Sequence, residues 1–148
     1  MKSEHLVIAI DGPAASGKSS VARALAKKLG LVYVNSGAMY RAFTWHVLKK
    51  KIDPRDTPSV LILLHAMDFQ CGLNGAESSI RIEGVDPDSH LSDAAVNENV
   101  SIIASIPEVR EFLVGKQREY ARDHDLVMEG RDIGSVVFPG TKWKFYVD

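Results

Sequence analysis

The sequence has one cysteine, almost no net charge and no long apolar run. With Cys71 as its single cysteine, the chain cannot form an internal disulfide, which fits a reducing compartment. Its longest apolar stretch, Val60–Leu64, falls far short of the about 20 residues that span a bilayer. The apolar run Leu6–Ile10 ends at Asp11 and is too short for a signal peptide. We therefore expect a soluble, cytoplasmic protein with no membrane partner.

The charge balance excludes a generally basic nucleic-acid binder. Lys and Arg number 18 against 19 Asp and Glu, a formal net charge of −1, so any site for an anion must be local. The 148 residues are 45% hydrophobic and 25% charged, as in ordinary globular proteins and unlike disordered ones. At this length we expect one domain over residues 1–148. We also expect a monomer, although the sequence itself does not determine the oligomeric state.

Short apolar runs alternate with helical patterns in the first third of the chain and near its end. This alternation predicts a parallel sheet built from βαβ units, because buried parallel strands are joined by crossover helices. The expected order is a strand at His5–Ile10, a helix at Lys18–Leu29, a strand at Leu31–Val34 and a helix from Ala38 to about Lys50. Two more buried strands are expected at Asp125–Glu129 and Trp143–Val147.

The middle of the chain has a different pattern. A helix is expected at Thr57–Met67, and two alternating segments, Asp68–Leu73 and Ser79–Val85, flank the hairpin signal Asn74-Gly75. Two helices should follow, one over about Asp93–Ser105 with Ser92 as its N-cap and one from Pro107 through residues 110–122. We interpret residues 58–105 as an insertion whose antiparallel strands lie off the main sheet.

The first chemical motif runs from Gly12 to Ser19 and matches the phosphate-binding pattern GxxxxGK[ST]. It follows a predicted strand and opens a predicted helix, where backbone N–H groups and the helix N-terminus attract phosphate oxygens. Lys18 should reach the β- and γ-phosphates of a nucleotide, and the Ser19 hydroxyl should ligate Mg²⁺. The alternative is a glycine-bearing turn that binds no ligand.

Two further motifs follow predicted strands. Asn35–Arg41 forms another helix N-terminus, and the alternative is a Ser36 N-cap with a solvated arginine. Glu129–Gly134 contains Arg131-Asp132 between glycines, which alone is more often a structural ion pair. All three motifs should meet at the carboxyl edge of one sheet, where α/β proteins bind ligands. This arrangement suits phosphoryl transfer, with the acceptor held by Arg41 and Arg131 and Mg²⁺ beside the donor.

These segments together resemble the bacterial cytidylate kinases, of the nucleoside monophosphate kinase group. The resemblance spans essentially the whole chain, and the segments that carry it are Ile10–Ser20, Asn35–Ala42, Ile106–Glu111 and Glu129–Pro139. The last is the most family-specific, because the phosphate loop alone indicates only a P-loop kinase. The resemblance implies an α/β fold of the P-loop kinase type, a parallel sheet flanked by helices, with a small antiparallel insertion in the monophosphate-binding domain.

The resemblance also implies an activity, in which ATP and Mg²⁺ convert CMP or dCMP to the diphosphate. The residues expected around the ATP phosphates are Gly12, Pro13, Ala14, Ala15, Ser16, Gly17, Lys18, Ser19 and Ser20. By the same resemblance, Ser36, Arg41 and Arg131 would hold the CMP phosphate, and Ser101, Arg110 and Asp132 would face cytosine. Lys18, Arg41 and Arg131 would be the catalytic residues. Alternatives are another small P-loop kinase and a non-catalytic nucleotide-binding remnant.

The sequence departs from the family pattern in two places. Asn35 stands where the family commonly has Asp. Family members also continue past the segment that ends at Asp148, into an arginine-bearing lid, a final strand and a helix. The resemblance therefore implies a fragment that lacks the lid and the last strand.

Because lid arginines shield the transferring phosphoryl group from water, we predict that this chain binds nucleotides but turns over poorly. The measurement is CDP formation from ATP and CMP by a mass-verified 148-residue chain. A rate typical of full-length family members would contradict the prediction.

Overall fold

A computed structural model describes residues 5–148, which form two compact units. Unit 1 takes residues 5–37, 73–78 and 114–148, and unit 2 takes residues 38–72 and 79–113. Every helix and strand expected from the sequence is present, with ends that differ by a few residues.

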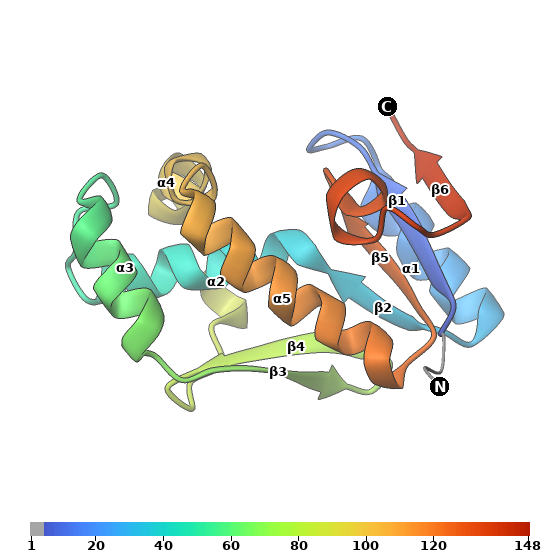
Figure 1. Ribbon diagram of the computed structural model, residues 1–148, viewed down its shortest axis with the longest axis horizontal. Helices are drawn as coiled ribbons and strands as arrows, with labels where there is room; N and C mark the ends of the chain where they lie inside the picture. Colours follow the sequence, from blue (N-terminus) through green and yellow to red (C-terminus); the bar gives the residue numbers. More distant parts are fainter. Residues whose placement is uncertain (1–4) are drawn as a thin grey trace. The chain divides into compact units, whose positions relative to one another are not determined.

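The main sheet has six strands in the order β3-β4-β2-β5-β1-β6 (Figure 1). Its bounds are β1 Val7–Asp11, β2 Val32–Asn35, β3 Phe69–Asn74, β4 Glu77–Ile82, β5 Leu126–Gly130 and β6 Trp143–Tyr146. The pairs β2–β5, β5–β1 and β1–β6 are all parallel. The predicted α/β fold class is confirmed, as a mixed sheet that is mostly parallel with one antiparallel pair.

The prediction that the hairpin β3–β4 lies off the main sheet was wrong, because both strands belong to that sheet. Its second strand pairs in parallel with β2, with Tyr33 opposite Glu77, so the hairpin extends one edge of the sheet. The local sequence specifies the hairpin turn, but strand pairing between distant segments depends on tertiary contacts that a local pattern does not contain.

Burial differs sharply between the central strands and β6. All five residues of β5 are buried, as are the first four of β1, which fits the apolar sequences of Val7–Ile10 and Leu126–Met128. All four residues of β6 are exposed, and the solvent-exposed fractions of Trp143, Phe145 and Tyr146 are 53%, 50% and 68%. The prediction of a buried strand there was wrong, because β6 lies at the edge of the sheet and pairs only with β1.

Helix α1 (Lys18–Leu29) packs on the sheet through small side chains. Ala22 and Ala26 are fully buried in a cluster that includes Ile8, Ile10 and Val127. The helix ends at Gly30, whose φ of 69° needs glycine, and whose N–H returns to the carbonyls of the last turn. The C-terminal part of α5 (Pro107–Asp123), which belongs to unit 1, covers the opposite face of the sheet (Figure 1).

Unit 2 is mainly helical. It contains most of α2 (Ser36–Lys49), α3 (Thr57–Ala66), the 3₁₀ turn η1 (Asp88–His90), α4 (Ala94–Ala104) and the first part of α5. Its core includes Phe43, Leu64 and Ile103, which are almost completely buried. No helix within residues 5–148 combines the length and the apolar character needed to cross a bilayer.

The N-cap of α4 is Asp93, one residue after the expected Ser92. Asp93 has an extended backbone, with φ −57° and ψ 144°, and the helix begins at the next residue. Its carboxylate lies 3.1 Å from His90 Nδ1 and makes no capping bond. A contact with His90 across the preceding turn therefore occupies the side chain that would otherwise cap the helix.

Candidate active site

The phosphate-binding loop connects β1 to α1, as expected. Its N-cap residue Gly17 has φ 86°, and a glycine has no side chain to satisfy the first-turn N–H groups of α1. Those amides and the positive end of the helix are therefore free to bind an anion. At the start of the loop, the Gly12 N–H donates to the Gly130 carbonyl over 3.1 Å. A Cβ on Gly12 would overlap the Val147 carbonyl, so this approach requires glycine.

Two side chains of the loop have polar groups suited to phosphate. The Ser16 hydroxyl is buried and has no hydrogen-bond partner among the described residues. An orphaned buried hydroxyl is unfavourable unless a ligand or water satisfies it. Lys18 Nζ donates to the Pro13 carbonyl over 3.2 Å and so lies over the loop. These groups fit a phosphate chain in the loop.

A buried carboxylate lies next to the expected metal ligand. Ser19 Oγ donates to Glu129 Oε1 over 2.8 Å, and the Tyr33 hydroxyl donates to Glu129 Oε2. Glu129 is only 3% exposed, so its two oxygens need these hydroxyl partners. Burial, with the hydrogen bond to Glu129 and its charge, raises the pKa of Tyr33 and keeps this donor protonated. Arg23 stacks on the Tyr33 ring, 4.8 Å from its centroid.

The ends of β2 and β5 meet through Ser36. Its hydroxyl donates to the Glu129 carbonyl over 2.8 Å, and the side chain is buried. A Cβ on Gly130 would overlap Ser36 Oγ and lie 2.8 Å from the Ile133 side chain. Gly130 is therefore required by the close approach of α2 to the exit of β5. Arg131, which follows, is exposed.

The remaining predicted site residues divide between the units. Within unit 1, the structure brings the loop of residues 12–17, Ser36 and the Arg131-Asp132 pair to the carboxyl ends of three parallel strands. In unit 2, Arg41 Nη1 on α2 donates to the Leu91 carbonyl over 3.1 Å and to Asn97 Oδ1. Two others in unit 2 occupy helices, the exposed Ser101 on α4 and the half-buried Arg110 on α5.

The chain matches one known protein family over nearly its whole length. The family model described as cytidylate kinase matches residues 8–148. The chain belongs to the cytidylate kinase family. The resemblance inferred from the sequence is thereby confirmed.

Individual cytidylate kinases are similar along nearly the whole chain. A cytidylate kinase of Desulforamulus reducens is 46% identical over 144 residues, which is 97% of this chain and 64% of the relative. One of Clostridium botulinum (strain Loch Maree / Type A3) is 41% identical over 143 residues, with the same coverage. A bifunctional pantoate ligase/cytidylate kinase of Synechococcus elongatus is 44% identical over 146 residues, 95% of this chain and 28% of that protein. The chain thus spans 64% of the length of the first two relatives.

Sequence reasoning assigned no role to Glu129, although it singled out the segment that contains it. The signal that could have identified it is its place in β5, where Glu129 is a charged residue directly after the apolar residues Leu126–Met128. Tyr33 was also missed, since a tyrosine in an apolar strand is most simply core. Both roles depend on contacts between residues about 100 positions apart, 96 for Tyr33 and 110 for Ser19.

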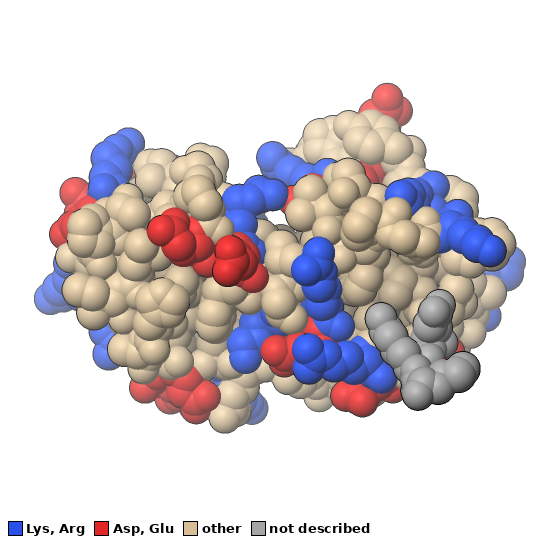
Figure 2. Space-filling view, in the orientation of Figure 1, with Lys and Arg blue, Asp and Glu red and all other residues tan. Residues whose placement is uncertain are grey.

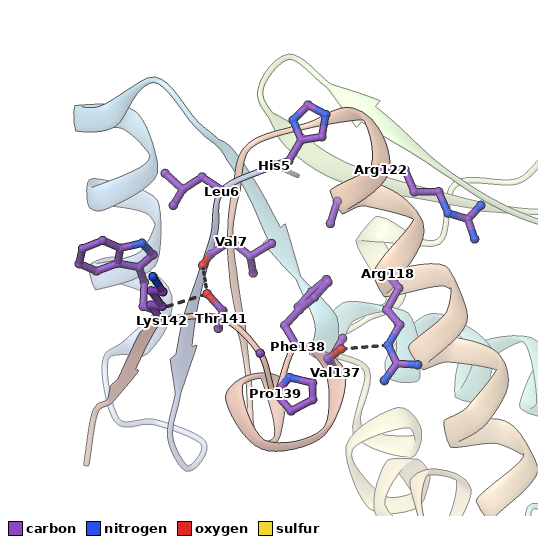
Figure 3. A pocket seen from close by; sticks show the side chains of 13 residues that line it. His5, Leu6, Val7, Arg118, Arg122, Val137, Phe138, Pro139, Thr141 and Lys142 are labelled. Carbon is purple, nitrogen blue, oxygen red and sulfur yellow. Dashed lines mark hydrogen bonds between the residues drawn. The ribbon is translucent and has the colours of Figure 1, made fainter. Parts of the chain in front are cut away.

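A hollow of about 960 Å³ lies elsewhere in unit 1, at the amino ends of β1 and β6 (Figure 3). Its wall includes Phe138 and Pro139, and Arg118, Ala121 and Arg122 of α5. Arg118 is held there by the carbonyls of Val136 and Val137, each 2.9 Å away. Basic side chains are visible over the C-terminal part of α5 in Figure 2. None of the predicted site residues lines the hollow, so it is separate from the phosphate loop.

The close contact at Gly130 predicts a specific loss of stability. Gly130→Ala should lower the free energy of unfolding by about 1–3 kcal/mol, because its Cβ has to displace Ser36 and Ile133. Thermal unfolding is the measurement. Gly140→Ala is the matched control, since a Cβ there meets nothing within 4 Å. Equal melting temperatures for the two variants would contradict close packing of Ser36 and Ile133 against Gly130.

Proposed function

We propose that this chain is the nucleotide-binding core of a kinase that transfers the γ-phosphoryl group of ATP to CMP or dCMP. The observation that carries the proposal is the register of β1 and β5, in which Asp11 lies opposite Gly130. With the 3.1 Å bond from Gly12 to Gly130, this register supports a donor loop and an acceptor loop that work side by side.

On the donor side, the loop of residues 12–20 binds the phosphates of ATP. Backbone N–H groups of the loop and the N-terminus of α1 surround the phosphate oxygens. Lys18 exchanges the weak neutral acceptor Pro13 for a phosphate oxygen, which gives a charge-assisted hydrogen bond. The Ser16 hydroxyl gains the partner that it lacks within the described residues.

The residues near Ser19 fit Mg²⁺. The described residues contain no group of three or more His, Cys, Asp or Glu side chains that could hold a metal. Mg²⁺ needs no such group, because it is bound by one or two protein ligands, substrate phosphates and water. Ser19 would supply a hydroxyl ligand, and Glu129, which already accepts from it, would orient that hydroxyl. When bound, the ion neutralises charge on the phosphates.

On the acceptor side, Ser36, Arg41 and Arg131 hold the phosphate of CMP. A guanidinium has five N–H donors, so the contacts of Arg41 with Leu91 and Asn97 leave donors for a phosphate. Unit 2, which contains most of residues 58–105, forms the monophosphate-binding part.

Cytosine is read by three side chains, Ser101, Arg110 and Asp132. The amino group of cytosine donates to the Asp132 carboxylate, and its O2 and N3 atoms accept from Arg110 and Ser101. This donor and acceptor set favours cytosine over a base with a carbonyl at the same position.

The transfer requires no general base. The attacking atom is an oxygen of the CMP phosphate, whose second pKa of about 6 leaves it largely ionised at neutral pH. The contribution of Lys18, Arg41 and Arg131 is therefore to orient the two phosphates and to offset their mutual repulsion.

Calorimetry with separate ligands tests the proposal. Lys18→Ala should weaken binding of adenylyl imidodiphosphate about tenfold or more and leave CMP affinity unchanged. Arg131→Ala should do the reverse, because each variant removes charge-assisted bonds to one phosphate group only.

Two exposed basic residues of unit 1, Lys28 and Arg122, provide matched controls. Their alanine variants should bind both ligands as the unaltered chain does. Binding of UMP, AMP or shikimate in preference to CMP would contradict the choice of acceptor. Failure of Lys18→Ala to weaken binding of the ATP analogue would contradict the donor site.

A further inference from the structure

Asp11, the last residue of β1, holds the turn that follows Arg131-Asp132. Its Oδ1 accepts the Ile133 N–H over 2.8 Å, and its Oδ2 accepts the Gly134 N–H over 2.9 Å. These are the first two amides of the π-helical turn η2 (Ile133–Val137). The chain that leaves β5 therefore passes over the end of β1, and the Asp11 carboxylate fixes it there. Hydrogen bonds to a charged acceptor are stronger than neutral ones.

The pair Arg131-Asp132 is thus held on both sides. Before it, the Gly130 carbonyl accepts the Gly12 N–H over 3.1 Å, and after it the amides of Ile133 and Gly134 bind Asp11. Both anchors come from consecutive residues, the last of β1 and the first of the phosphate loop. The donor loop and the acceptor turn are in this way parts of one small framework.

We infer that Asp11 is a positioning residue that orients Arg131 and Asp132 for the acceptor nucleotide. Each of its carboxylate oxygens is engaged by a backbone N–H, so its role is to hold the turn and not to transfer a proton. The inference rests on the proposed function, because it assigns the acceptor to Arg131 and Asp132. It adds that acceptor affinity depends on a residue outside the phosphate-binding motif.

The test variant is Asp11→Asn, in the 148-residue chain. The amide oxygen can accept one N–H, but the amide NH₂ then faces the second N–H as another donor. CMP affinity, measured by calorimetry, should fall about tenfold, and affinity for adenylyl imidodiphosphate should stay within about twofold. Hydrogen exchange of the Ile133 and Gly134 amides, measured by NMR without ligand, should become faster.

Asp125 offers a matched control. Its Oδ1 accepts the Leu6 N–H over 2.7 Å, so it also ties a carboxylate to a backbone amide, but at the amino edge of the sheet. Asp125→Asn should leave CMP affinity unchanged. If Asp11→Asn does not fold, Gly134→Ala replaces it, since a Cβ there would crowd Asp11 Oδ2 at 3.3 Å and Lys144 at 3.1 Å.

The outcomes separate the inference from the proposed function. A selective loss of CMP affinity together with faster exchange supports the positioning role. Unchanged CMP affinity in Asp11→Asn overturns it, as does an equal loss for Asp125→Asn. If the unaltered chain does not bind CMP, the proposed function fails and the assignment of Asp11 to an acceptor fails with it. The exchange measurement then still decides whether Asp11 holds the turn.

Discussion

The parallel pairing of β1 with β5 is the constraint on which the candidate site depends. Because the two strands end in register, with Asp11 opposite Gly130, their following loops leave the sheet at the same point. A shift by one residue would turn every side chain of β5 to the other face and move Glu129 away from Ser19. Glu129 reaches the hydroxyls of Ser19 and Tyr33 in this register, which therefore favours it.

That register also places hydrogen-bond donors beside the buried carboxylate of Glu129. An ionised Glu129 that is 3% exposed would be strongly unfavourable without partners. Hydroxyls from two other elements, Ser19 on α1 and Tyr33 on β2, supply them, so the carboxylate joins three segments of unit 1. The same close approach of segments requires glycine at positions 12 and 130, where a Cβ would overlap a neighbouring backbone or side chain. The residues that allow the segments to pack closely, Gly12 and Gly130, therefore adjoin the residue that binds Ser19, Glu129.

Local signals in the sequence predicted the elements and the phosphate loop. The bounds of α1 were predicted correctly, because its apolar spacing and the terminal Gly30 are both local features. What failed depends on neighbours distant in sequence. The exposure of β6 and the pairing of the β3–β4 hairpin with β2 are examples. The contacts of Glu129 and Asp11 escaped for the same reason, since each carboxylate bonds a segment more than 100 residues away.

We propose that the phosphate loop and the exit of β5 form one nucleotide-binding framework. The most direct measurement is an NMR titration of the ¹⁵N-labelled chain with Mg²⁺ and adenylyl imidodiphosphate. We expect amide shift changes in residues 12–20 and 129–134 at the same ligand concentrations, and none at Leu6 or at residues 139–142. Changes confined to the loop, or centred on the amino edge of the sheet, would contradict it.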